Sequence, residues 1–186
     1  NILHADQHID EETNTFFMRL EWSLKGFFIP QEKIERAFAP IAKKFAMKCD
    51  VCFSDRKPLV AIFVSKHLHC LYDLLLRHRS GQLPCEIACI VSNHPDARTV
   101  AQDFDINFYL YPITPRNKAS QEKRELDVLK KERVELVVLA RYHQILTPQV
   151  VNRFKNRIIN IHHSFLPAFA GKNPYQQAFT KGVKII

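Results

Sequence analysis

The chain has 186 residues, of which 46% are hydrophobic and 25% are charged, a composition that suits one globular domain, or one domain and part of another. The net charge of +8 comes from scattered Lys and Arg residues with no run of five or more, which favours a solvated surface over a nucleic-acid footprint. No apolar run approaches the roughly 20 residues that a membrane span needs. The five cysteines, an odd number, favour reduced thiols in the cytoplasm over a secreted disulfide scaffold.

Residues 1–55 are predicted to form a unit of their own. Residues 2–9 alternate apolar and polar side chains, which predicts a half-buried strand, and residues 15–22 predict a second strand paired to it as a hairpin. Pro30 begins a predicted helix, and residues 47–53 predict a final strand. The apolar face of that helix comprises Ile34, Ala37, Phe38 and Ile41. This order indicates a partial ferredoxin-like domain that lacks its first strand and helix.

The pattern changes after a polar break at residues 55–58, which we take as the domain boundary. Five strands are predicted beyond it, at residues 59–64, 85–91, 107–111, 136–140 and 157–161, and the first is a continuous apolar, β-branched run. Helices are predicted between them at residues 69–79, 96–104, 120–133 and 148–154. The third of these helices is strongly charged and is predicted to lie on the surface, and the fourth is predicted to be capped by Thr147. The alternation predicts an α/β fold with a parallel sheet.

The segment most indicative of chemistry lies at the carboxyl end of the fifth predicted strand. Asn160 and His162 are two residues apart, so on a strand their side chains point to the same face. In parallel sheets, ligands bind beyond the carboxyl ends of the strands, and this pair sits at such an end. An amide that donates to an oxyanion beside an imidazole that moves a proton suits attack on an acyl carbon. The residues alone leave open whether both side chains only hold a loop in place.

The sequence Asn-Ile-His followed by Ser-x-Leu-Pro, at residues 160–167, resembles the signature of folate-dependent formyl enzymes. The doubled His and the ending Pro-Ala-Phe resemble the formyltetrahydrofolate deformylases in particular. The resemblance implies that Asn160 binds the formyl oxygen and that His162 is the acid–base group. It also implies hydrolysis of 10-formyltetrahydrofolate to formate and tetrahydrofolate, which serves one-carbon and purine metabolism, with no cofactor and no metal.

Two more segments resemble the deformylases. Residues 65–75 follow the first buried strand, and their His-Cys-Leu before Asp-Leu-Leu is similar to the deformylase form of that loop. Glycinamide ribonucleotide formyltransferases carry a glycine-rich phosphate loop there, whereas this chain has no glycine between Gly26 and Gly81. Residues 138–147 resemble the pterin-binding loop, although deformylases commonly have Met where His143 stands. The substrate-binding residues implied are Arg141, Tyr142, His143, Gln144, Ile145, Leu146 and Ser164.

The resemblance extends to residues 1–55, which look like the ACT domain that deformylases carry before the catalytic domain; residues 56–186 look like the N-terminal part of that Rossmann-like, formyltransferase-type domain. An ACT domain implies a small amino-acid effector and a homo-oligomer. The third catalytic group of the family is an Asp that lies downstream of a strand similar to residues 182–186. We therefore expect the sequence to be a fragment of a longer chain and, as written, to be catalytically incomplete.

Several alternatives remain open at this point. A formyltransferase on the same scaffold would need an acceptor site, and a non-catalytic amino-acid sensor would use only residues 1–55. A nucleic-acid binder would show steep salt dependence. Cys49 and Cys52 have the spacing of half a zinc site, but no second pair follows, so core thiols are favoured. The roles of His67 and His69, in the loop after the first buried strand, are not decided by the sequence.

Overall fold

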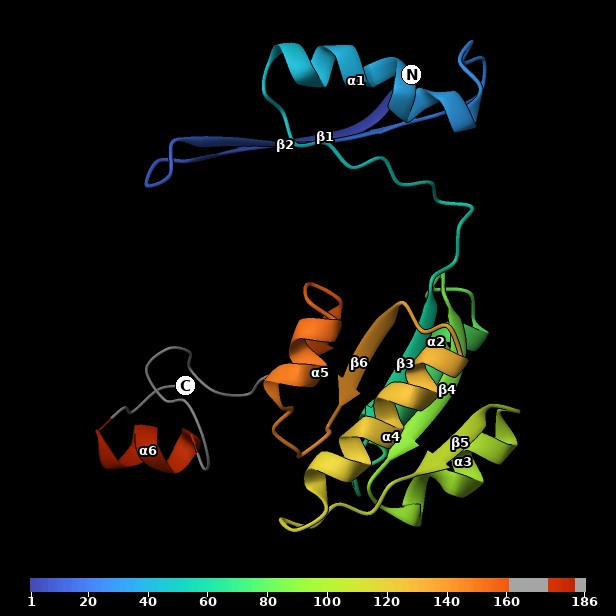
Figure 1. Ribbon diagram of the computed structural model, residues 1–186, viewed down its shortest axis with the longest axis vertical. Helices are drawn as coiled ribbons and strands as arrows, with labels where there is room; N and C mark the ends of the chain where they lie inside the picture. Colours follow the sequence, from blue (N-terminus) through green and yellow to red (C-terminus); the bar gives the residue numbers. More distant parts are fainter. Residues whose placement is uncertain (161–173, 183–186) are drawn as a thin grey trace. The chain divides into compact units, whose positions relative to one another are not determined.

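The computed structural model describes residues 1–160 and 174–182. The chain divides into two compact units, Asn1–Asp55 and Arg56–Ile186 (Figure 1). We call them the N-terminal unit and the α/β unit and describe each by itself.

The N-terminal unit contains an antiparallel hairpin and one helix. Strands β1 (Ile2–Asp10) and β2 (Thr15–Trp22) pair as predicted, with Asp10 opposite Thr15. The Asp10 carboxylate organises the turn, because it accepts hydrogen bonds from the Thr13 hydroxyl at 2.6 Å and from the Glu12 N–H at 3.0 Å. A short 3₁₀ helix, η1 (Gln31–Lys33), leads into α1 (Ile34–Lys44).

Two predictions for this unit are wrong. Residues 47–53 form no strand, and the Met47 N–H instead donates to the Ala42 carbonyl at the end of α1. A strand needs a neighbouring strand for its backbone hydrogen bonds, and the side-chain pattern of one segment cannot supply that neighbour. The hairpin strands are also exposed on both faces rather than half-buried, because two strands and one helix enclose little volume. On the predicted apolar face of α1, Ile34 is buried while Ile41 is 48% exposed.

The α/β unit contains a five-stranded parallel sheet with the order β5-β4-β3-β6-β7 (Figure 1). The strands are β3 (Leu59–Val64), β4 (Glu86–Ser92), β5 (Asn107–Leu110), β6 (Leu136–Ala140) and β7 (Ile158–Asn160). The helices are α2 (His69–Arg79), η2 (Pro95–Ala97) with α3 (Arg98–Asp103), α4 (Lys118–Lys131), α5 (Pro148–Arg153) and α6 (Pro174–Thr180). The predicted α/β fold is confirmed, and α6 is an addition to it.

Two apolar layers hold the helices to the sheet. On one face, Leu129 of α4 and Phe154 after α5 pack with Phe63 of β3; on the other, Leu71 of α2 and Val100 of α3 pack with the opposite side of the strands. Burial of each such large apolar side chain contributes about 1.5–3 kcal/mol. Because β3 is buried on both faces, its sequence is apolar without interruption.

The strand order fixes where a ligand can bind. The chain moves from β3 outward to β5 and then crosses back to β6 on the other side of β3. The connections therefore leave the carboxyl ends of β3 and β6 in opposite directions, and such a point in a parallel sheet is where ligands usually bind.

The helix α4 has the charged, exposed face that was predicted, but two of its acids are buried. Glu122 is only 3% exposed and Glu125 only 1%. Both acids lie on the inner face of the helix with Leu129, which is one and two turns further along. A buried carboxylate is costly unless it has partners, so the contacts of these two acids require an explanation.

Candidate active site at the carboxyl edge of the sheet

Ser65 joins neighbouring strand ends at the carboxyl edge of the sheet. It directly follows β3 and is buried. Its hydroxyl donates to the Asn93 side-chain oxygen, after β4, at 2.7 Å and accepts the backbone N–H of His143, after β6, at 3.1 Å. The ends of three neighbouring strands are thereby held together, and the one proton of the Ser65 hydroxyl is already donated within the protein.

The segment of residues 141–147, which we call the edge loop, follows β6 and contains six of the predicted substrate-binding residues. Arg141 has a φ of 60°, an unusual value for a residue with a side chain and one that surrounding contacts must maintain. Ile145 is 84% exposed, and His143 is exposed, whereas Gln144 and Leu146 are half-buried. The Ile145 side chain, in the middle of this loop, is therefore open to solvent.

Tyr142 turns inward from the edge loop. Its ring packs edge-on against Phe63 with centroids 5.2 Å apart, and its hydroxyl donates to Glu125 at 3.0 Å. Burial, followed by the charge and the hydrogen bond of Glu125, raises the pKa of Tyr142 above its ordinary value. The Tyr142 side chain therefore supports the loop from beneath, and what it can offer a substrate is its backbone.

The buried acids of α4 are the partners of the edge loop. Glu122 accepts the Thr147 N–H at 3.2 Å and lies 3.9 Å from the Lys118 ammonium, which in turn donates to the Ile145 carbonyl. Burial raises the pKa of Glu125 to about 7, with the Tyr142 hydrogen bond lowering it and the charge of Glu122 raising it. Thr147 occupies the position before α5 as predicted, but its side chain makes no capping hydrogen bond.

Asn160 is the last residue of β7 and is exposed at the carboxyl edge. It is paired in register with Leu139 of β6, so it lies beside the strand from which the edge loop departs. His162 and Ser164 lie outside the described residues, and the distance between Asn160 and His162 is therefore not given by the structure. His67, whose role the sequence left open, lies beside the edge loop, its ring centroid 6.0 Å from that of His143.

Comparison with known proteins shows the family of the chain. Residues 59–186 match the family model described as formyl transferase. The chain belongs to the formyl transferase family. The formyltetrahydrofolate deformylase of Synechocystis sp. is 50% identical over the whole of this chain, and that of Bacillus subtilis is 43% identical. This chain spans 65% and 62% of the length of those two relatives.

Solved structures of the same family distinguish two branches. A deformylase from Pseudomonas syringae superposes with a TM-score of 0.91 at 40% identity and covers 98% of this chain, which covers 61% of it. A glycinamide ribonucleotide transformylase from Geobacillus kaustophilus gives a TM-score of 0.62 at 27% identity, with 69% of this chain and 70% of its own covered. The resemblance to the deformylases that the sequence predicted is confirmed, since they match both units of this formyl transferase family member.

The described residues offer little for a metal ion. Among residues 1–160 and 174–182, no group of three or more His, Cys, Asp or Glu side chains is arranged to hold one. Cys49 and Cys52 are free and exposed rather than core thiols, because the strand predicted to bury them does not form.

No helix in the described part of the chain is long and apolar enough to cross a membrane.

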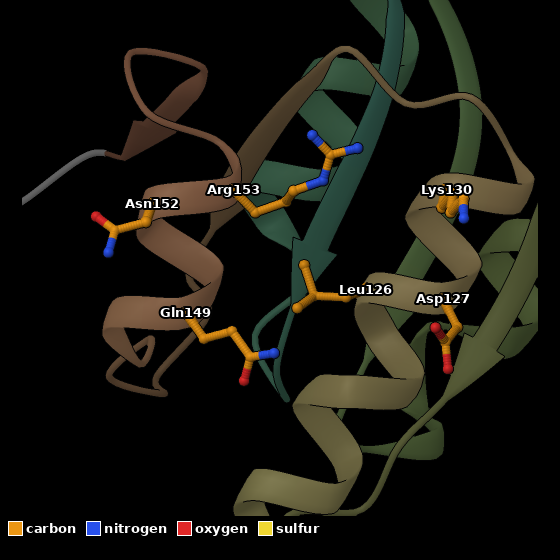
Figure 2. A pocket seen from close by; sticks show the side chains of 6 residues that line it. All are labelled: Leu126, Asp127, Lys130, Gln149, Asn152 and Arg153. Carbon is orange, nitrogen blue, oxygen red and sulfur yellow. The ribbon is translucent and has the colours of Figure 1, made fainter.

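A pocket of about 520 Å³ lies between α4 and α5, away from the residues predicted for the site (Figure 2). Its lining comprises Leu126, Asp127, Lys130, Gln149, Asn152 and Arg153. These residues belong to α4 and α5 and not to the loops that follow the strands. The lining contains no His to move a proton, and it includes none of the residues predicted for the site, so the edge of the sheet remains the candidate site.

The sequence contained an overlooked signal for Glu122 and Glu125. Leu129 marks the inner face of α4, and positions four and seven residues before it fall on the same face of a helix. Acids at those two positions indicate either an error in the predicted face or a polar partner inside the fold. The structure identifies that partner as the edge loop.

Proposed function

We propose that this protein hydrolyses 10-formyltetrahydrofolate to formate and tetrahydrofolate. The observation that carries the proposal is the match to formyltetrahydrofolate deformylases over the whole chain, whereas a glycinamide ribonucleotide transformylase covers only 69% of it. The engaged hydroxyl of Ser65 supports the same choice, because it is not free to bind an acceptor phosphate where transferases have their phosphate loop.

In the proposed reaction, the oxygen of a water molecule attacks the formyl carbon and the carbonyl oxygen becomes an oxyanion. Asn160 donates its side-chain amide to that oxyanion, which suits its exposed position at the end of β7. His162 takes a proton from water and delivers one to the folate nitrogen as the bond from carbon to nitrogen breaks. The edge loop, with Ser164, binds the pterin. The chemistry needs no resident cofactor and no metal, and no described residue is assigned the role of the third catalytic carboxylate.

The assay that tests this proposal is formation of tetrahydrofolate and formate in buffer free of acceptor amines, with the protein produced from its full reading frame. We expect turnover in that buffer. Turnover that appears only after glycinamide ribonucleotide is added would assign the protein to the transferase branch instead. Activity that persists after chelation of metals would support hydrolysis without a metal ion, and activity that chelation abolishes would contradict it.

We further propose that the N-terminal unit is an ACT-like regulatory domain that binds a small amino acid and pairs with a second copy in the cytoplasm. Deformylase relatives match these residues together with the α/β unit, and both hairpin strands leave large apolar side chains exposed, among them Ile2 and Phe16. Light scattering on the protein produced from its full reading frame should show a dimer or larger assembly. A clean monomer at micromolar concentration would contradict this proposal.

A further inference from the structure

Two carboxylates of α4 lie directly beneath the edge loop, and each gives one oxygen to it. Glu125 accepts the Tyr142 hydroxyl near the start of the loop, and Glu122 accepts the Thr147 N–H at its end. The second oxygen of each carboxylate has no hydrogen-bond partner among the described residues. Two buried acids on one helix face are unfavourable for folding alone, so their presence favours a role in the conformation of the loop.

Lys118 adds a third contact to the middle of the loop. Its ammonium donates to the Ile145 carbonyl and lies 3.9 Å from Glu122, so the same side chain neutralises an acid and holds the loop backbone. The three α4 side chains thus hold the beginning, middle and end of a segment that starts at the positive φ of Arg141. Such a backbone conformation persists only when neighbouring groups maintain it.

We infer that Glu122 and Glu125, with Lys118, are positioning residues of the reaction, which fix the edge loop so that its backbone presents a preformed surface to the substrate. This inference rests on the proposed function for the identity of the substrate, but the ordering of the loop can be measured without it. A site that is already ordered binds its ligand more tightly than one that is ordered only part of the time, because the apparent affinity falls with the fraction of competent molecules.

The charged groups that face Glu125 are known. They are Tyr142 from the edge loop, Tyr111 after β5, and Glu122 and Lys118 from its own helix. With a pKa of about 7, Glu125 changes its charge near neutral pH and so changes the net charge beneath the edge loop. The affinity for substrate should therefore depend on pH through Glu125, and the dependence should disappear in Glu125→Gln, whose amide oxygen still accepts the Tyr142 hydroxyl.

The experiment combines amide hydrogen exchange with steady-state kinetics on the protein produced from its full reading frame. Glu122→Ala should raise the exchange rate of the Thr147 amide by on the order of tenfold, and it should raise KM for 10-formyltetrahydrofolate more than it lowers kcat. Glu122→Gln should restore much of the protection, because its amide oxygen can accept the same N–H. The matched control is Asp127→Asn, which makes the same charge change as Glu122→Gln on the exposed face of α4 and should leave exchange and KM unchanged.

The outcomes separate this inference from the proposed function. Unchanged exchange in the edge loop of a folded Glu122→Ala or Glu125→Ala variant would overturn the inference, as would a loss confined to kcat. If Glu122→Ala does not fold, the Gln variants decide, since loss of the pH dependence of KM in Glu125→Gln supports positioning and its retention contradicts it. A wild-type protein that releases no formate would refute the proposed function, whereas the exchange result would still stand for or against the positioning of the loop.

Discussion

Replacement of Glu125 by Gln should make the free energy of unfolding of the protein less dependent on pH. Glu125 is 1% exposed, and burial raises its pKa from 4.5 to about 7. A carboxyl group whose pKa is higher in the folded than in the unfolded state contributes stability below its unfolded pKa, and that contribution is lost as the pH rises through the folded value. The wild-type protein should therefore lose stability between about pH 4.5 and pH 7, and Gln at this position carries no proton to lose.

The size of the effect follows from the two pKa values. A rise from 4.5 to about 7 corresponds to at most about 3 kcal/mol of unfolding free energy, at about 1.4 kcal/mol for each pH unit. Most of this loss falls between pH 5 and pH 7. For a unit of this size, the difference in Tm between the Glu125→Gln variant and the wild type should increase by roughly 8–10 °C from pH 5 to pH 8.

Scanning calorimetry of both proteins at several pH values measures this difference directly, and subtraction cancels the groups that titrate in both. Asp127→Asn serves as the control, because Asp127 is exposed on the same helix and its difference from wild type should stay constant with pH. A difference between Glu125→Gln and wild type that is flat from pH 5 to pH 8 would show that Glu125 is ionised throughout. The rise in the pKa of Glu125 that we attribute to burial would then be wrong.

Three further outcomes are expected. Asn160→Ala and His162→Ala should each lower kcat by roughly a hundredfold, with little effect on folate binding. His163→Ala should have a much smaller effect, because His163 is on the opposite face of the predicted strand. An equal loss in His163→Ala would show that the assumed register of this strand is wrong. Phe63→Ala should destabilise the α/β unit by about 3–5 kcal/mol in urea titrations, because it leaves a cavity beside the edge loop; a loss below about 1 kcal/mol would contradict the packing described. Cys89, fully buried and with its pKa raised to about 12 mainly by burial, should react with a thiol reagent only when the protein unfolds, whereas the two exposed cysteines of the N-terminal unit should react at once.

The sequence predicted the α/β unit well because its strands carry their own signal. Residues 59–64 and 136–140 were predicted with the bounds that the structure gives, since strands buried on both faces must be apolar throughout. Residues 47–53 had a weaker signal, and the predicted strand was wrong. Whether a short alternating segment becomes a strand depends on a partner edge, which is a property of the tertiary structure and not of the segment.

The candidate site divides in the same way. The motif at residues 160–167 indicated the chemistry, and the family of the chain agrees with that indication. The spacing of Glu122 and Glu125 relative to Leu129 placed them on the inner face of α4, but it could not show that their partner would be the edge loop. Their burial depends on hydrogen bonds to residues that are 17 and 25 positions away.

The sequence by itself determined the order of strands β3 to β7 with the helices between them, and the family to which the chain belongs, because periodicity and short motifs are local properties. Only the tertiary structure decided that β3 and β6 lie side by side, that Ser65 joins the ends of three strands, and that two acids support the edge loop. These features arise from pairings between distant parts of the chain. Their energies depend on burial and geometry that exist only once the chain has folded.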